Sequence, residues 1–476
     1  MIPLLILTLG CAPKKPTLSA SPDGRVTLSA PAPLPSGPVS FEPPVAQVLP
    51  LATGGELWLL PRDGLPLVSL RLLVPGGKAL SPGDKPGLVA FSDTMLEHGA
   101  GERDAQAFAA ALDQLAADLS VSTTDTWTIV SLDVHSDRIE PALDLLADLV
   151  LRPRFEPAEV ERLRELRKAE LQSAMDDPRT VATWVSERAW YGEGHPLALP
   201  AIGTLDSLDQ LGADELRASW ESRRAAAAPR LVVAGDVQVE ALTASIAARL
   251  DGWEVTGPPA ASPPPPAAVP SLLLVDNPGA SQTMLMVTLP GPGALDESVH
   301  GARLGAVVLG GTFTSRLNRL LREEKGYTYG ASARLRAGPT DGRIVVGTSV
   351  QKDVTGPALV DLLGEIDRLH LGLSTDELDK ARGSNLSDLV EEASTRSSLA
   401  DSAAELLRLS LPPEALSTRI QAEAEQRPEQ ALAALSRSRT ANGTVVVVGD
   451  LSQVRAAVLE AVPGAWVEVD RQGAPR

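Results

Sequence analysis

The feature that most constrains this chain is an internal repeat. Three short segments recur in the same order at offsets of 214 to 218 residues. The pairs are 229–236 with 443–450, 141–146 with 357–363, and 159–164 with 377–382. Because repeated structural units recur at a fixed period, three matches at nearly constant spacing predict two tandem homologous domains.

Strand patterns alternate with helical patterns within each copy. β-Branched and apolar runs typical of strands occupy residues 67–74 and 126–134, and the second copy has a similar run at 343–350. Apolar side chains recur at helical spacing in residues 108–119 and 139–150. The patterns predict an α+β fold in which each copy is a sheet covered by helices.

Two proline-rich segments divide the chain. Residues 12–46 are rich in Pro, Ser and Ala, which favours an extended tether. Residues 256–270 are dominated by proline, which favours a semi-rigid spacer. The predicted organisation is a signal region at 1–11, the tether at 12–46, domains at 47–255 and 271–476, and a linker at 256–270.

The single cysteine, Cys11, directly follows a short apolar run and a glycine. The run is far shorter than the roughly 20 residues that span a bilayer, but it has the size of a signal-peptide core. This arrangement resembles a bacterial lipoprotein signal, which implies lipidation of Cys11 and anchoring in the cell envelope. Because Ala12 follows the cysteine, we expect an outer-membrane lipoprotein that faces the periplasm. The other interpretation is a buried or free cysteine near the terminus.

Composition excludes several classes of protein. A hydrophobic content of 43% excludes a disordered chain, and a formal net charge of −18 argues against nucleic acid as a partner. No two of the five histidines lie within one helical turn of each other, so a local histidine-based metal motif is absent. We find no Ser/His/Asp or Cys/His arrangement typical of nucleophilic catalysis.

The segment at 87–100, GLVAFSDTMLEHGA, resembles the first-domain motif of the insulinase, pitrilysin and mitochondrial processing peptidase family. In that family the motif G-L-A-H-x-x-E-H-M-L-x-x-G-T supplies two histidines that bind zinc and a glutamate that acts as general base. The resemblance covers essentially all of residues 47–476. It implies a mainly antiparallel sheet in each domain and a chamber enclosed by the two domains.

The ligands of that motif are replaced in this chain. Its three positions fall on Ala90, Asp93 and Thr94. Glu170 lies at or within one residue of the family's third ligand, but one carboxylate cannot hold a catalytic zinc. We therefore interpret Glu170 as vestigial and expect no metal or other cofactor in this chain.

Glu97 and His98 form a decoy motif. A shift of four residues would place them in the Glu-His positions, but it would also break the alignment of the glycines. We interpret His98 as a loop residue.

The segment at 309–329, LGGTFTSRLNRLLREEKGYTY, is similar to the family's second-domain signature. The resemblance implies that Arg322 and Tyr329 contact the backbone of a bound peptide near the scissile bond, with Tyr327 as an alternative to Tyr329. Arginine offers a fixed fork of donors and tyrosine a hydroxyl on a rigid ring, and both suit peptide carbonyls. The alternative is that Arg322 pairs with neighbouring glutamates and Tyr329 packs beneath the sheet.

The loss of one motif and the retention of the other predict a catalytically inactive subunit. It would help bind peptide or unfolded polypeptide in a heteromeric metallopeptidase, whose zinc is carried by a partner subunit of the same family. One alternative is a scaffold or binding lipoprotein of the same fold, in which Arg322 and Tyr329 are relics. The other is an active peptidase with a non-standard site, using Glu97, His98 and Glu170.

Overall fold

The structure is a computed structural model that describes residues 18–20, 26–28, 41–51, 53–259, 263–267 and 271–476. The chain divides into two units, Met1–Glu42 and Pro43–Arg476. In the first unit, β1 (Leu18–Ala20) pairs antiparallel with β2 (Val26–Leu28). Cys11 and most of the predicted tether lie outside the described residues.

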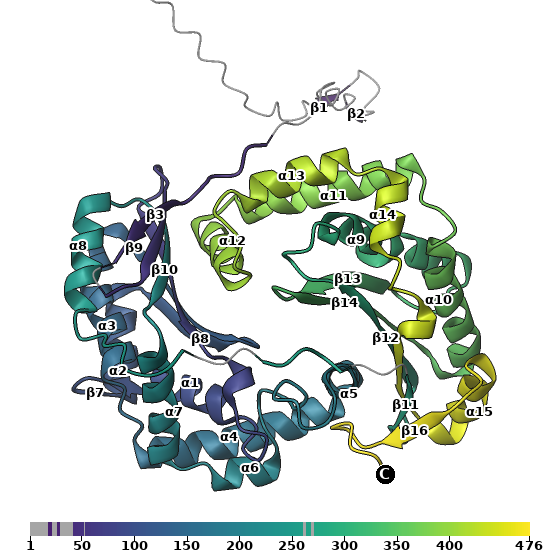
Figure 1. The fold of residues 1–476 in the computed structure, drawn as a ribbon, viewed down its shortest axis with the longest axis horizontal. Coiled ribbons are helices and arrows are strands. Elements are labelled where there is room, and N and C mark those ends of the chain that lie inside the picture. Colours follow the sequence, from purple (N-terminus) through teal and green to yellow (C-terminus); the bar gives the residue numbers. More distant parts are fainter. Residues whose placement is uncertain (1–17, 21–25, 29–40, 52, 260–262, 268–270) are drawn as a thin grey trace, which may run out of the picture. The chain divides into compact units, whose positions relative to one another are not determined.

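The second unit contains two six-stranded sheets (Figure 1). The first has the order β3 (Gln47–Pro50), β4 (Glu56–Pro61), β10 (Arg230–Gly235), β5 (Leu67–Pro75), β9 (Trp127–His135) and β8 (Asp118–Thr123). The second has the order β13 (Ala331–Ala337), β14 (Asp341–Gln351), β12 (Gln282–Pro292), β15 (Thr444–Gly449), β11 (Ser271–Asp276) and β16 (Trp466–Val469).

The two sheets repeat one topology. In the first sheet only β4 and β10 pair in parallel, and in the second sheet β11 pairs in parallel with both β15 and β16. The order β4-β10-β5-β9-β8 corresponds strand for strand to β11-β15-β12-β14-β13. The predicted α+β class with two homologous domains is confirmed.

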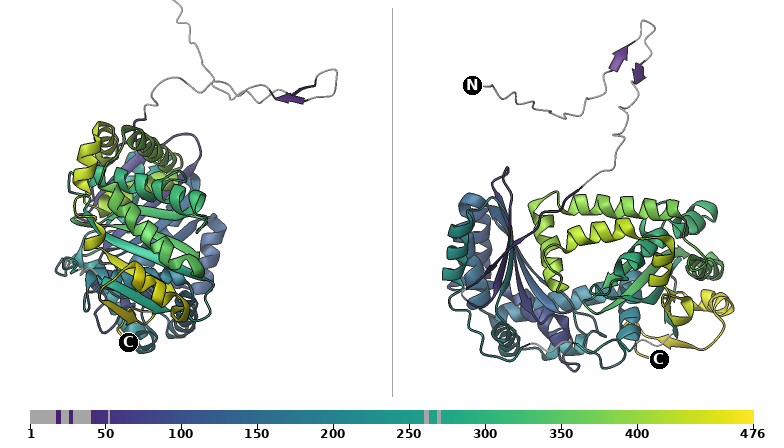
Figure 2. Two further views of the ribbon diagram at one scale, coloured as in Figure 1. Left: turned by 90° about the vertical axis from the view of Figure 1, so that its right-hand side faces the viewer. Right: turned by 45° about the horizontal axis from the view of Figure 1, so that its top comes forward.

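Helices cover the faces of the two sheets, as Figure 1 and the two further views in Figure 2 show. In the first half they are α1 (Leu88–Leu96), α2 (Ala105–Leu115), α3 (Ile139–Leu151), α4 (Pro157–Asp176), α5 (Pro178–Tyr191), α6 (Leu205–Gln210), α7 (Ala213–Ala226) and α8 (Val239–Arg249). In the second half they are α9 (Val299–Ala306), α10 (Thr355–Leu369), α11 (Thr375–Glu392), α12 (Arg396–Arg408), α13 (Ala415–Glu425), α14 (Pro428–Ala434) and α15 (Leu451–Ala461). No helix of the described ranges combines the length and the apolar character needed to cross a membrane.

One predicted helix ends earlier than its periodicity suggests. Asp104 caps α2, because its carboxylate accepts a hydrogen bond from the Ala107 amide at 2.8 Å. The helix ends at Leu115, since Ala116 adopts a left-handed φ of 47°. Leu119, which we predicted to continue the helical stripe, lies instead in the edge strand β8.

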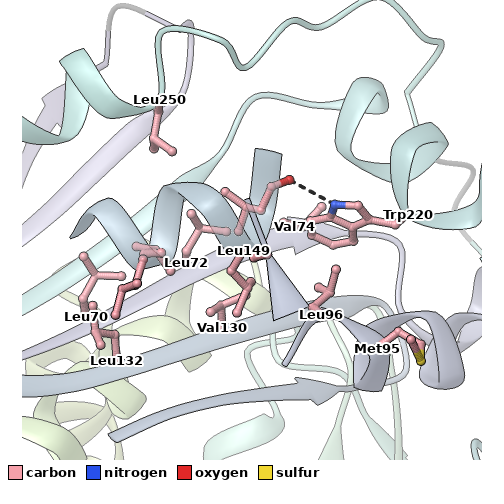
Figure 3. Packing of buried hydrophobic residues seen from close by; sticks show 14 of the residues in the cluster. Leu70, Leu72, Val74, Met95, Leu96, Val130, Leu132, Leu149, Trp220 and Leu250 are labelled. Atoms are coloured by element: carbon pink, nitrogen blue, oxygen red, sulfur yellow. Dashed lines mark hydrogen bonds between the residues drawn. The ribbon is translucent and has the colours of Figure 1, made fainter. Parts of the chain in front are cut away.

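The core of the first half joins its sheet to the helices on one face. Alternate residues of β5, such as Leu70 and Leu72, point into this cluster (Figure 3). Trp220 of α7 is completely buried there, and its indole N–H donates to the Val150 carbonyl at 3.0 Å. Met95 at the end of α1 belongs to the same cluster, so the helix that carries the motif positions is fixed to the sheet.

The opposite face of each sheet is covered by a helix from the other half. Helix α12 packs its apolar side on β5 and β10, where Leu399 and Leu407 meet Leu73. Helix α5 packs in the same way on β12 and β15. Buried Arg71 of β5 adds an ion pair, because its Nε lies 2.6 Å from an Asp401 carboxylate oxygen of α12. This exchange of helices joins the two halves into one unit.

Candidate functional site

Helix α1 starts at a position that requires glycine. Gly87 has a φ of +88°, and a Cβ there would lie 2.8 Å from the Cα of Gly203. The start of α1 therefore packs directly on the backbone at Gly203, which fixes the direction in which the motif residues project.

Asp93 has no free acceptor oxygen on the inner side of α1. Its side chain is 1% exposed, and Oδ1 accepts a hydrogen bond from Arg223 of α7 at 2.6 Å. Oδ2 accepts from the hydroxyls of Thr123 at 2.6 Å and Thr128 at 2.7 Å. Because both oxygens are engaged by donors in a buried setting, this carboxylate balances an arginine instead of ligating a cation.

The Thr94 side chain is hydrogen-bonded both to Ala90 and to a second arginine. The Thr94 hydroxyl donates to the Ala90 carbonyl at 2.9 Å and accepts from Nη1 of Arg167 at 3.0 Å. Arg167 is 8% exposed, and its guanidinium carbon lies 5.2 Å from the centroid of the Phe91 ring. Burial lowers the pKa of Arg167, while the negative charges of Glu170 and Asp93 raise it. Two guanidinium groups thus lie beside the motif positions.

The zinc ion that the resemblance implies does not fit these residues. Ala90 has no donor atom, Asp93 is fully hydrogen-bonded, and Thr94 is bonded to a cation. Glu170 is exposed on α4. Across the part of the chain that the structure describes, no group of three or more His, Cys, Asp and Glu side chains is arranged to hold a metal ion.

Glu97 and His98 lie in the turn after α1. Glu97 accepts a hydrogen bond from the Val121 amide at 2.5 Å, and burial raises its pKa. His98 has its Nδ1 3.8 Å from a Glu159 carboxylate oxygen, and burial together with Arg162 lowers its pKa. The structure therefore joins neither residue with Glu170 in a metal-binding cluster.

The second-half signature segment is fixed to its surroundings at two points. Gly310 approaches β13 so closely that an added Cβ would lie 2.4 Å from the Ala333 nitrogen. Asn318 donates to the Ala331 carbonyl and accepts from the Ala331 amide, both at 2.9 Å. Two stretches have wide π-type turns: Val307–Gly311, which overlaps the start of the segment, and Asn318–Glu324 within it.

A third anchor ties the segment to α11. Arg316 forms a two-pronged ion pair with Glu377, with Nε to Oε1 at 2.7 Å and Nη2 to Oε2 at 2.9 Å. The Arg316 hydrogen bond lowers the pKa of Glu377 to about 2. Such paired, parallel contacts fix both distance and orientation.

Of the side chains between and beyond these anchors, Phe313 and Tyr329 are exposed and Arg322 is half-buried. The guanidinium carbon of Arg322 lies 3.8 Å from the ring centroid of Phe313, which is 62% exposed. Tyr329 is 93% exposed and therefore does not pack beneath the sheet, whereas Tyr327 is partly buried against the core of the second half. Glu324 forms its ion pair with Arg319, whose Nε lies 3.8 Å from Oε1 of Glu324. Among the described residues it forms none with Arg322.

Sequence reasoning missed Phe313, Arg167 and Arg223. Phe313 stands in the quoted signature two residues after the double glycine, and an aromatic side chain in a glycine-rich turn is a signal for an exposed contact. Arg167 and Arg223 lie 73 and 130 residues from their partners in the motif. No local pattern marks such distant pairs.

Comparisons with known proteins agree with this architecture. The family model described as insulinase (peptidase family M16) matches residues 59–204, and the model described as the peptidase M16 inactive domain matches residues 210–385. A solved peptidase M16 inactive domain from Pseudomonas fluorescens superimposes with a TM-score of 0.79 at 23% identity, covering 85% of this chain and 97% of that one.

Two curated relatives are similar over parts of the sequence. An uncharacterized zinc protease of Mycobacterium leprae is 27% identical over 253 residues, which are 52% of this chain and 56% of that protein. This match therefore spans little more than half the length of the relative. Cytochrome b-c1 complex subunit 1 from Caenorhabditis elegans mitochondria is 24% identical over 178 residues, 37% of each chain. Since two M16 models match consecutive domains, the chain belongs to the insulinase (M16) peptidase family.

Proposed function

We propose that this protein is a non-catalytic M16 subunit that helps bind peptide substrate in a heteromeric zinc metallopeptidase. The observation that carries the proposal is the buried ion pair of Asp93 with Arg223, 2.6 Å apart. A zinc peptidase needs a metal-bound water and a carboxylate free to take its proton. In this chain the carboxylate at that position is surrounded by donors, so it has no role as a general base.

Substrate binding would fall to the exposed side chains of the second half. Arg322 stacks on Phe313, which leaves the guanidinium N–H groups at its edge for an acceptor. A hydrogen bond from a charged donor contributes about 1.5 to 3 kcal/mol. A peptide in extended conformation presents free backbone carbonyls, so the substrate class is peptides or unfolded polypeptide.

The catalytic zinc would come from a partner subunit of the same family. The Mycobacterium leprae relative bears the name of a zinc protease, and a chain of that kind with an intact H-x-x-E-H motif is the partner that we propose. This chain itself would hold no cofactor.

We extend the proposal to location. Lipidation of Cys11 would place the protein in a bacterial outer membrane, facing the periplasm. Labelling of cells with a fatty-acid analogue tests this, because the label would mark the wild type and be lost from Cys11→Ser.

Reconstitution tests the function. The protein is mixed with the M16 chain of the same genome that carries H-x-x-E-H, and cleavage of an internally quenched peptide is measured. We expect the mixture to exceed both separate chains, and Arg322→Ala and Tyr329→Phe to lower kcat/KM while the complex still forms. Equal activity of the partner with and without this chain would overturn the proposal.

A second candidate is a scaffold with no part in proteolysis. The similarity to a cytochrome b-c1 complex subunit favours it, since that protein is named as a component of an assembly. Under this candidate the complex would form, and the Arg322→Ala variant would behave like the wild type in every assay.

A further inference from the structure

A cavity of about 530 Å³ lies in the second half, lined by residues of α9, α12 and α13 and by the C-terminal residue of α11. Its volume falls in the range of small-molecule sites, about 300 to 1,000 Å³. One part of the wall is apolar and consists of Val299, Leu406, Leu409, Leu411, Pro412 and Leu416. None of these residues belongs to the motif positions or to the 309–329 segment, so the cavity is separate from the site described above.

Two arginines in the lining share one carboxylate. Glu423 is 4% exposed, and its Oε1 lies 3.3 Å from Nη1 of Arg303 and 2.9 Å from Nε of Arg419. Its other oxygen, Oε2, accepts from the Asn385 amide at 2.9 Å. The remaining N–H groups of both guanidiniums have no hydrogen-bond partner among the described residues, while both side chains line the cavity. Two cations therefore face the cavity, and the one carboxylate that bonds to them is shared.

The pKa of Arg303 reflects the closeness of the two arginines. Burial, followed by the charge of Arg419, lowers the pKa of Arg303 to about 10. An added anion between the two guanidiniums would relieve this repulsion.

The acidic residues of the lining bond to partners other than Arg303 and Arg419. Asp401 is bound to Arg71 at 2.6 Å, and Glu405 is bound to Arg408 through two contacts at 2.5 and 2.6 Å. Burial raises the pKa of the remaining one, Glu392, which accepts a hydrogen bond from the Ser402 hydroxyl at 3.5 Å. The free N–H groups of Arg303 and Arg419 are therefore not occupied by an acidic residue of the lining.

His300 of α9 adds an unpaired polar atom to the same wall. Its Nδ1 is buried and has no hydrogen-bond partner within the described residues. Burial and the neighbouring Arg303 lower its pKa, which favours the neutral ring at pH 7. A buried polar atom without a partner costs stability unless a ligand or water satisfies it.

We propose that this cavity binds an amphipathic carboxylate, that is, a carboxylate joined to an apolar group. The carboxylate accepts hydrogen bonds from the free N–H groups of Arg303 and Arg419. The apolar group packs against Leu406 of α12 and Leu416 of α13. Two sources offer this chemistry: the C-terminal residue of an apolar peptide and a medium-chain fatty acid.

Isothermal titration of the purified protein distinguishes the sources. The probes are N-acetyl-Leu-Leu with a free carboxylate, octanoate, and the corresponding amides of both. We expect saturable binding of one carboxylate and loss of binding for its amide. Binding of the peptide alone identifies a C-terminus as the ligand, and binding of octanoate alone identifies a fatty acid.

Variants locate the binding at the cavity. Arg419→Gln should weaken it about 10-fold or more, whereas Arg439→Gln, at an exposed arginine outside the lining, should leave it unchanged. If Arg419→Gln does not fold, Leu416→Trp takes its place: it narrows the cavity and should abolish binding. Equal binding of acid and amide, no saturation by either carboxylate at millimolar concentration, or unchanged affinity in the Arg419 and Leu416 variants would overturn the proposal.

Discussion

The two halves of the protein share a topology but use their polar side chains in opposite ways. Around α1 the side chain of Asp93 is buried, and both of its oxygens accept hydrogen bonds. In the 309–329 segment Tyr329 extends into solvent, and the half-buried Arg322 stacks on the exposed ring of Phe313. Polar groups matched inside the protein stabilise the fold, whereas exposed and unmatched ones remain available to a ligand. This contrast underlies our proposal that the first region has a structural role and the second binds the peptide.

The largest expected effect is on stability in the first region. Asp93→Ala leaves Arg223 buried without its counter-charge, so the free energy of unfolding should fall by about 3 to 5 kcal/mol. Urea denaturation measures it. The control Asp113→Ala, at an exposed position of α2, should change stability by less than about 0.5 kcal/mol. If both variants are equally stable, the buried pair does not hold the first region together.

The next effect concerns binding in the second region. Arg322→Ala removes a charged donor, so kcat/KM of the reconstituted peptidase should fall about 10- to 100-fold. Its unfolding free energy should stay near that of the wild type, because the structure shows no hydrogen bond or ion pair of the Arg322 side chain to another described residue. Arg319→Ala, on the same helical stretch and 62% exposed in its side chain, is the matched control. A loss of stability without a loss of activity would reverse the assignment of this region.

A smaller effect concerns the anchor of the second region and depends on pH. The Arg316 hydrogen bond depresses the pKa of Glu377 to about 2, so the ion pair contributes stability above the unfolded pKa of about 4.3. The contribution is lost as pH falls from there toward 2. Because the Glu377 side chain is partly exposed, solvent screening limits it to about 1 kcal/mol.

Glu377→Gln tests this anchor. Compared with the wild type, the variant should be about 1 kcal/mol less stable at pH 6, and the difference should shrink by pH 3. Glu429→Gln, at an exposed position of α14, should show no such dependence. A difference that grows as the pH falls would contradict the sign of the shift.

The smallest effect is at Phe313. Phe313→Leu removes the aromatic face beneath Arg322, which should weaken substrate binding by about 0.5 to 1 kcal/mol, the range of an exposed cation–π contact. Peptide affinity of the reconstituted complex measures it, with Phe313→Tyr as the variant that keeps the ring. Identical losses for the leucine and tyrosine variants would mean that the ring does not position Arg322.

Much of the fold could be predicted because its signals are local. The strand predicted at 126–134 is observed at Trp127–His135, since a run of β-branched residues fixes its own conformation. The two domains could be predicted because short local patterns recur in the same order in both halves. The end of α2 could not be predicted, because Leu119 stands four residues after Leu115, as on a continued helix, and the turn that ends the helix is made by Ala116 and not by a glycine.

The candidate site was less accessible to sequence reasoning. The absence of donors at Ala90 could be read directly, but the role of Asp93 depends on Arg223, which the tertiary fold brings to it from 130 residues away. The crossing of α12 onto the first sheet is likewise a long-range feature. A chamber between the domains stays a prediction.

The most direct test of the central claim is the zinc content of the purified protein after dialysis against zinc, measured by mass spectrometry beside an M16 protein with an intact motif. Because Asp93 is paired with Arg223 and Arg167 lies beside Thr94, we predict that the reference protein retains zinc and that this chain retains essentially none. About one zinc per chain, lost in Asp93→Asn, would contradict the account.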